Sequence, residues 1–327
     1  MNTMHELETT QIVLAQEIGE RSEAFKKISQ EIHKTIMGQE EAVSCLMMAL
    51  LCKGHILLEG VPGVAKTSMI KALTNVLGLN FKRIQFTPDL LPSDLVGTLI
   101  YNPKTLDFET KKGPIFANLI LADEINRAPA KVQAALLEAM QEQQVTIGSQ
   151  TFLLDQPFLV CATQNPIEQE GTYRLPEAQL DRFFMKIQIN YPAAHHEKKI
   201  IAQDLEKVVI DRLLDKQNIL ELQALMEKIY VDERIIDYIV ALIQMTRSKE
   251  FAKYVICGAS PRATQALFKA SRAHAFIRGR YFVTPDDIKS VAVAILQHRL
   301  IPSYEAQAEG LTSLDLIKQI LKLVPTP

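Results

Sequence analysis

A glycine-containing turn between an apolar run and a helical pattern constrains this chain more than any other feature. The turn reads Gly60-Val61-Pro62-Gly63-Val64-Ala65-Lys66-Thr67. It follows the apolar residues 55–58, and a helical pattern begins at Ser68. In such a turn successive backbone N–H groups converge on an anion, and the helix N-terminus adds partial positive charge. We therefore predict that residues 60–68 bind nucleotide phosphates, that Lys66 reaches the β- and γ-phosphates, and that the Thr67 hydroxyl ligates Mg²⁺. The alternative is a strand-to-helix turn with an exposed lysine.

Ala65 departs from the usual pattern, which has glycine before the lysine. In a left-handed backbone an alanine costs roughly 1–2 kcal/mol, whereas in a right-handed helix start it costs nothing. We expect a right-handed backbone at residue 65.

The alternation of apolar runs and helical patterns predicts an α/β class with a five-stranded parallel sheet. Helical patterns at 67–77 and 130–141 fall between apolar runs, as crossover helices between parallel strands do. The expected strands are 55–58, 81–86, 119–122, 158–163 and 183–189. Two further segments, 97–113 and 144–154, have the turn residues of inserted hairpins, for which a surface loop without a role is the alternative.

Three regions are expected along the chain. Residues 1–35 form one or two amphipathic helices, because Ile12, Ile18, Phe25, Ile28 and Ile32 recur at near-helical spacing. Residues 36–192 form the α/β nucleotide-binding core. Residues 193–327 form an all-helical domain, with helices near 195–206, 218–229, 232–247, 261–278, 285–298 and 312–324.

Charge and composition restrict the possible partners. Lysine and arginine total 36 against 38 acidic residues, and no segment concentrates basic side chains as a nucleic-acid surface would. The four cysteines lack the spacing of a metal site. The first residues lack the features of a secretory signal, and the apolar run 43–51 is too short to cross a bilayer. We expect a cytoplasmic protein that does not enter a membrane.

Polar residues with catalytic potential follow two of the expected strands and precede a third. Asp123 and Glu124 end the strand at 119–122, where Asp123 would hold Mg²⁺ and Glu124 would polarise the water that attacks the γ-phosphate. Asn165 follows the strand at 158–163 and could orient that water. Arg182 either satisfies Asp181 locally or projects into a neighbouring subunit as an arginine finger.

The order of these motifs resembles that of the MoxR family of AAA+ ATPases, in the group with a helix-2 insert. The resemblance is carried by the phosphate loop and by four segments: Asp123-Glu124-Ile125-Asn126-Arg127, Thr163-Gln164-Asn165-Pro166, Leu175-Pro176-Glu177-Ala178-Gln179-Leu180-Asp181-Arg182-Phe183 and Ser260-Pro261-Arg262. It covers the chain from about residue 36 to residue 300, and loops that resemble residues 60–67, with alanine before the lysine, occur within the family.

The resemblance implies a role for each motif. Residues 60–67 match Walker A, Asp123 and Glu124 match Walker B, Asn165 matches sensor 1 and Arg182 matches the arginine finger. Arg262 matches sensor 2, which acts on a neighbouring subunit or not at all where the lid is displaced. Met37-Gly38-Gln39 resembles the segment that lines the adenine pocket. The hairpins match the helix-2 insert and the hairpin before sensor 1, and Tyr101 and Phe108 are either substrate contacts or packing aromatics.

The resemblance also implies an assembly and a class of partner. We expect Mg²⁺-dependent ATP hydrolysis by a homo-oligomeric ring, a hexamer, that remodels or matures protein partners. Such partners include proteins with a von Willebrand factor A domain. Three alternatives stay open: a motor acting on nucleic acid, the ATPase subunit of a magnesium chelatase, and a nucleotide switch that does not hydrolyse ATP. The presence of Glu124, Asn165 and Arg182 together disfavours the switch.

Overall fold

A five-stranded parallel sheet forms the centre of the protein in a computed structural model that describes residues 2–166, 172–202 and 208–327. The strand order is β2-β5-β8-β1-β9, and every neighbouring pair is parallel. This arrangement confirms the predicted α/β class. The strands are β1 (Ile56–Gly60), β2 (Phe81–Gln85), β5 (Leu119–Asp123), β8 (Leu159–Gln164) and β9 (Met185–Ile189).

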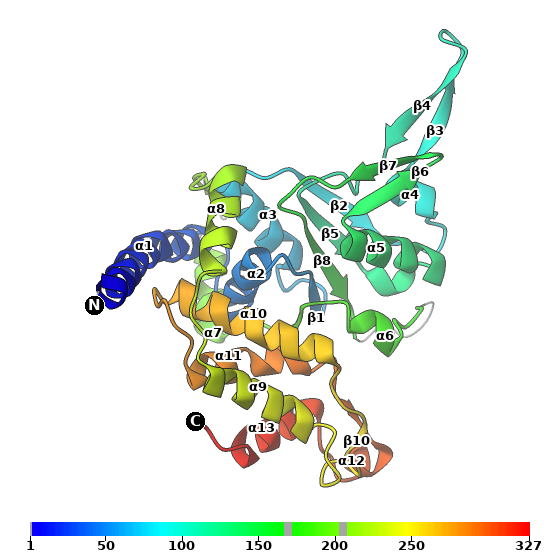
Figure 1. Ribbon diagram of the computed structural model, residues 1–327. Helices are drawn as coiled ribbons and strands as arrows, with labels where there is room; N and C mark the ends of the chain where they lie inside the picture. The colour runs from blue at the N-terminus through cyan, green and yellow to red at the C-terminus, as the bar shows by residue number, and fades with distance from the viewer. Residues whose placement is uncertain (1, 167–171, 203–207) are drawn as a thin grey trace.

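Helices cover both faces of this sheet, as the apolar strands require (Figure 1). Side chains alternate between the faces along a strand, so Ile56 and Leu58 belong to one core cluster and Leu57 to the other. The first cluster includes α2 (Glu40–Leu51) and α3 (Lys66–Leu77). The second includes α4 (Pro92–Val96) and α5 (Ala130–Glu142).

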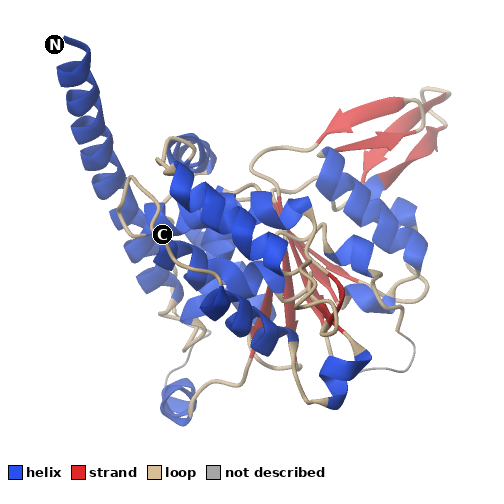
Figure 2. Ribbon diagram, turned by 60° about the horizontal axis from the view of Figure 1, so that its bottom comes forward, coloured by secondary structure: helices blue, strands red, loops and turns tan. Residues whose placement is uncertain are grey.

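The N-terminal segment forms one long helix, α1 (Asn2–Ile32). Ile18, Phe25, Ile28 and Ile32 are buried, as their spacing predicts, whereas Ile12 is 68 % exposed. The buried positions place the second half of α1 against the core, and the first half extends away from the rest of the chain (Figures 1 and 2).

A helical lid follows the sheet. Its helices are α7 (Ala194–Ala202), α8 (Lys216–Met226), α9 (Glu233–Met245), α10 (Pro261–Ile277), α11 (Pro285–Leu296), α12 (Tyr304–Ala308) and α13 (Ser313–Leu323). The predicted end of the first lid helix, at 203–206, lies outside the described residues. Ser260 caps α10 and Thr284 caps α11, which confirms two predicted helix starts. A short ribbon of β10 (Val255–Cys257) and β11 (Ile301–Pro302) was not expected, because strands of two or three residues leave no alternation to detect.

Two antiparallel hairpins extend from the edge of the core (Figure 1). The first joins β3 (Gly97–Asn102) to β4 (Asp107–Lys112), and the second joins β6 (Gln144–Ile147) to β7 (Gln150–Leu153). Both predicted hairpins are therefore present. They lie side by side, because a Cβ added at Gly148 would meet the Leu99 side chain at 2.6 Å. Among the described residues, no helix is long and apolar enough to cross a bilayer.

Candidate functional site

The predicted phosphate loop joins β1 to α3 at the carboxyl end of the sheet, where ligands bind in open α/β folds. Lys66 opens α3, and its Nζ donates a hydrogen bond to the carbonyl of Gly60 at the end of β1. Thr67 and Ser68 complete the first turn of the helix. A Cβ added at Gly63 would meet nothing within 4 Å, so the loop is open on that side. The first turn of α3 therefore presents its backbone N–H groups at this open edge.

Ala65 does not have the right-handed backbone that we expected. Its φ of 60° and ψ of 22° are left-handed, in the position before the first turn of α3. The carbonyl of Ala65 accepts the Met69 N–H at 2.9 Å, so the left-handed residue is where the loop turns into the helix. The cost of about 1–2 kcal/mol for an alanine in this region is therefore present in the native loop.

The carboxylate of Asp123 lies at the end of β5, two strands from β1 across β8. Its Oδ1 accepts a hydrogen bond of 2.6 Å from the Thr163 hydroxyl on β8. Its Oδ2 accepts bonds of 2.6 and 3.0 Å from the Arg83 guanidinium on β2. These contacts fix a carboxylate that is only 9 % exposed and aim it at the carboxyl edge of the sheet.

The next residue, Glu124, has a left-handed backbone with φ of 56°. This turn of the backbone directs its side chain away from β5. Its backbone N–H donates to the Thr163 hydroxyl at 2.8 Å. Its carboxylate accepts bonds from Gln85 at 2.8 Å and from Arg127 at 3.0 Å. Glu124 thus keeps an oriented carboxylate beside Asp123.

Asn165 comes directly after β8, which lies between β5 and β1. The residue is 6 % exposed. Because the three strands are parallel and adjacent, their carboxyl ends bring together the phosphate loop, the two acids and this amide. The sequence analysis assigned the same residues to one site for ATP hydrolysis.

A cavity of about 570 Å³ adjoins the phosphate loop. The phosphate loop, α3, the segment before α2 and the start of the lid all contribute to its lining. The lining residues include Ile36, Met37, Gln39, Ala65, Ser68 and Ile200. An apolar slot beside a phosphate-binding turn suits a purine base joined to a polyphosphate. Met37 of the predicted adenine segment lines this cavity, and Gly38 follows it in the chain.

Arg182 and Arg262 lie away from the phosphate loop. Arg182 precedes β9, whose first residue Met185 pairs with Ile56 at the start of β1. The loop follows Gly60 at the other end of β1, about 13 Å further along the strand. Both arginines line a separate cavity of about 300 Å³, whose other charged residues are Lys53, Asp181, Lys269 and Arg299. The structure thus divides the predicted catalytic residues between two opposite edges of the sheet.

Comparison with known proteins finds separate family patterns for the region of the sheet and for the lid. The pattern of the ATPase family associated with various cellular activities (AAA) matches residues 55–185, and the pattern of the AAA lid domain matches residues 247–320. Chaperone MoxR1 of Mycobacterium tuberculosis is 45 % identical over 304 residues, which are 91 % of this chain and 81 % of that protein. The chain belongs to the MoxR family of AAA ATPases.

Two further relatives of this MoxR-family ATPase match along nearly their whole length. Protein YeaC of Bacillus subtilis is 44 % identical over 304 residues, or 92 % of this chain and 94 % of that one. A crystal structure of a protein from Cytophaga hutchinsonii is 45 % identical with a TM-score of 0.89, and it covers 97 % of this chain and 99 % of that one.

The MoxR-family site contains contacts that sequence reasoning missed. Arg83, Gln85 and Arg127 bind the two acids, and Thr163 bridges them. Thr163 and Arg127 carried a signal in the sequence, because both stand in the segments that carry the family resemblance. Arg83 and Gln85 alternate with Ile84 on β2 and look like the polar side of a half-exposed strand.

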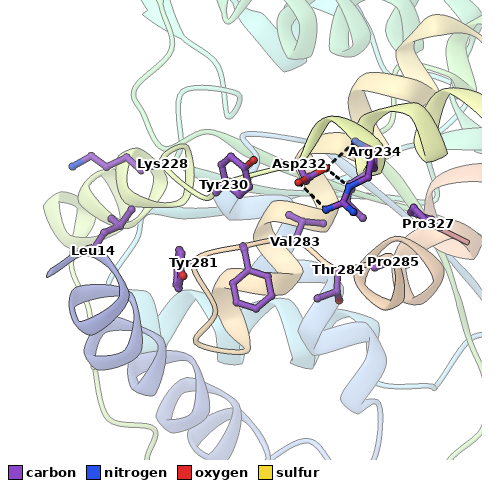
Figure 3. Close-up of a pocket in the computed structure, with 12 residues that line it drawn as sticks. Leu14, Lys228, Tyr230, Asp232, Arg234, Tyr281, Val283, Thr284, Pro285 and Pro327 are labelled. Carbon is purple, nitrogen blue, oxygen red and sulfur yellow. Dashed lines mark hydrogen bonds and ion pairs between the residues drawn. The ribbon is translucent and has the colours of Figure 1, made fainter. Parts of the chain in front are cut away.

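Another cavity, of about 600 Å³, lies on the lid rather than at the nucleotide site (Figure 3). Tyr230, Tyr281 and Phe282 line it together with Leu14 of α1. Its acidic side chain, Asp232, is bound by the Arg234 guanidinium (Figure 3). None of the predicted nucleotide-site residues lines this cavity.

Proposed function

We propose that this MoxR-family ATPase hydrolyses ATP with Mg²⁺ as a homo-oligomeric ring, a hexamer of the helix-2-insert type, and remodels protein partners. One observation carries the ring proposal: the exposed Arg182 lies at the opposite edge of the sheet from the phosphate loop of its own chain. A single chain therefore holds the nucleotide without its arginine finger, and a neighbour has to supply it.

The residues present fit Mg²⁺. Thr67 offers a hydroxyl in the first turn of α3, and Asp123 offers a carboxylate held at the same edge of the sheet. Magnesium is commonly bound by one or two protein oxygens together with substrate phosphates, and it would neutralise charge on the β- and γ-phosphates. Lys66 and the N-terminus of α3 would bind the phosphates, Glu124 would polarise the attacking water, and Asn165 would orient it.

Arg182 and Arg262 would meet the γ-phosphate of the neighbouring subunit. The charged side chains that line the cavity they share are mainly basic, with Asp181 as the acidic one, and this charge suits a phosphate approaching from outside. An arginine finger supplied in trans contributes about 10³–10⁵ in kcat where it operates.

Mixed rings test this assignment. Arg182→Ala subunits keep an intact Walker site, and Glu124→Gln subunits keep an intact finger. Each variant alone should be inactive. Rings that contain both should recover ATPase activity, because the finger of one completes the site of the other. No recovery, despite mixed assembly confirmed by mass spectrometry, would refute a site shared between subunits.

The exposed side chains of the first hairpin support the proposal that this ATPase acts on other proteins. Leu99, Ile100, Tyr101, Leu106 and Phe108 of the first hairpin are each at least 41 % exposed. Apolar side chains gathered at an exposed tip suit binding of another protein. The name of the relative Chaperone MoxR1 supports the same reading. A partner with a von Willebrand factor A domain would have to be another polypeptide.

Capture of the partner uses the Glu124→Gln protein. With ATP, stalled hydrolysis should retain the partner on the ring, and a Tyr101→Ser/Phe108→Ser version should retain less of it. Equal capture by both would exclude the hairpin as the contact. The nucleic-acid alternative predicts ATPase activity that DNA stimulates and that salt suppresses steeply. The chelatase alternative predicts capture of the other chelatase subunits.

A further inference from the structure

Residues 181–184, which carry Arg182 into β9, are held by side chains of the lid. Arg182 is exposed, whereas Phe183 and Phe184 are buried. Arg299, which follows α11 in the lid, contacts the other three residues of this segment. Arg182 therefore extends from a segment whose other three residues are held in place by contacts with the lid.

Arg299 binds four oxygen atoms of the segment. Its Nε donates to Oδ1 of Asp181 at 2.8 Å, and its Nη2 donates to the carbonyls of Asp181 at 3.2 Å and Phe183 at 2.6 Å. Its Nη1 donates to the carbonyl of Phe184 at 3.2 Å. The Arg299 side chain is 3 % exposed. A planar guanidinium used in this way fixes the path of the backbone as well as the side chain of Asp181.

The N-terminus of α10 holds the second oxygen of Asp181. The Ser260 hydroxyl donates to Oδ2 at 2.9 Å, and a guanidinium nitrogen of Arg262 lies 3.9 Å from it. From the core side, the Phe184 N–H donates to the carbonyl of His55 at 2.7 Å. The segment is therefore held between His55, which directly precedes β1, and two parts of the lid, so a rotation of the lid has to move or break these bonds.

We propose that Arg299 is a positioning residue for Arg182: through Asp181 it couples the orientation of the lid in one subunit to the arginine finger offered to the next. This inference rests on the proposed function, because it gives Arg182 its role in trans. The nucleotide cavity is lined by residues that precede α2 and begin the lid. The lid thus lines the cavity that we propose for the nucleotide of its own subunit and also holds the segment that carries Arg182.

The test uses two variants that keep the approximate size of the side chain and lose some of the bonds between Arg299 and residues 181–184. Arg299→Lys keeps the charge but loses the planar fork, and Asp181→Asn keeps the size of the side chain but loses its charge. In homomeric rings each should lower kcat about 10–100-fold, the effect of a misplaced catalytic group. The affinity for a fluorescent ATP analogue should change less than about twofold, because the phosphate loop is untouched. Unchanged kcat in both variants would overturn the proposal.

Mixed rings then separate positioning from a general structural defect. Arg299→Lys subunits mixed with Glu124→Gln subunits should regain activity, since the Walker site of the former receives an intact finger from the latter. Arg280→Lys is the matched control, because Arg280 binds the buried Asp287 within the lid and, among the described residues, forms no hydrogen bond or ion pair with residues 181–184. It should keep the kcat of the parent ring.

The mixing result distinguishes the two proposals. Rescue of Arg182→Ala without rescue of Arg299→Lys or Asp181→Asn would overturn the positioning role and leave the shared site standing. Failure to rescue Arg182→Ala would remove the shared site itself. If Arg299→Lys does not assemble by gel filtration, Asp181→Asn alone decides the question by the same two readouts.

Discussion

The hydroxyl of Thr163 donates a hydrogen bond of 2.6 Å to Oδ1 of Asp123 and so joins the carboxyl ends of β8 and β5. The same hydroxyl accepts the Glu124 N–H at 2.8 Å. One buried oxygen atom therefore sets the position of both acids that the proposed hydrolysis requires.

Replacing Thr163 with valine tests this arrangement. Valine has nearly the same shape but can neither donate to Asp123 nor accept from Glu124. We expect kcat to fall about 10–100-fold through misplacement of the acids. The free energy of unfolding should also fall by about 1–3 kcal/mol, because buried polar groups lose their partner. Steady-state ATPase assays and urea titrations measure the two effects. Thr163→Ser, which keeps the hydroxyl, should retain most of the activity.

Much of the fold and of the nucleotide site could be predicted from the sequence. The phosphate loop, Asp123, Glu124 and Asn165 each follow an apolar strand, and parallel strands bring their carboxyl ends together. The contacts of Arg83 and Gln85 could not be predicted, because strand order is decided by pairing across the whole sheet. Within the central sheet, the strand that precedes β5 in sequence, β2, is also its neighbour in space. The role proposed for Arg299 depends on packing between segments 118 residues apart.

The backbone at Ala65 gives a second prediction. A left-handed alanine costs about 1–2 kcal/mol, and part of the gain from glycine is offset by its greater freedom in the unfolded chain. Ala65→Gly should therefore raise the free energy of unfolding by up to about 1 kcal/mol. Ala134→Gly, at an exposed position inside α5, is the control and should lower it by about 1 kcal/mol. Equal losses in both variants would contradict the left-handed backbone.

His55 should make the stability depend on pH. Its Nε2–H donates to the Met140 carbonyl at 3.0 Å, and its Nδ1 accepts the Val160 N–H at 3.0 Å. Burial lowers the pKa of His55 from 6.5 to about 4, since the charged ring would lose its solvation. Between these values the unfolded chain binds more protons than the native one, so stability is complete above about pH 6.5 and falls as the pH drops toward 4.

The size of this effect follows from the shift in pKa. At 1.36 kcal/mol for each unit, His55 contributes a loss of about 3 kcal/mol across the window. Urea titrations at pH 7, 6, 5 and 4.5 would measure it. His55→Gln should be less stable at pH 7 and should show a shallower decline below pH 6.5. Part of the decline will remain, because burial also lowers the pKa of His298. An identical slope in both proteins would exclude His55 as a titrating group.

Gly38 and Gly310 form a matched pair for testing the adenine side of the nucleotide cavity. Their φ angles are 75° and 74°, so an alanine at either position carries a similar backbone cost. A Cβ at Gly38 would lie 2.9 Å from Nδ1 of His196 in the lid, whereas a Cβ at Gly310 would meet nothing within 4 Å. Met37 and Gln39, on either side of Gly38, line the cavity.

The two alanine variants should therefore lose similar stability and differ in nucleotide binding. Gly38→Ala has to displace either His196 or its own backbone, so we expect the Kd for ATP to rise about tenfold, equivalent to about 1.4 kcal/mol. Gly310→Ala should bind ATP like the parent protein. Isothermal titration with ATP and Mg²⁺ would measure both. A shift of residues 37–39 should weaken the binding of an adenine held beside them. An unchanged Kd in Gly38→Ala would therefore indicate that the base binds elsewhere.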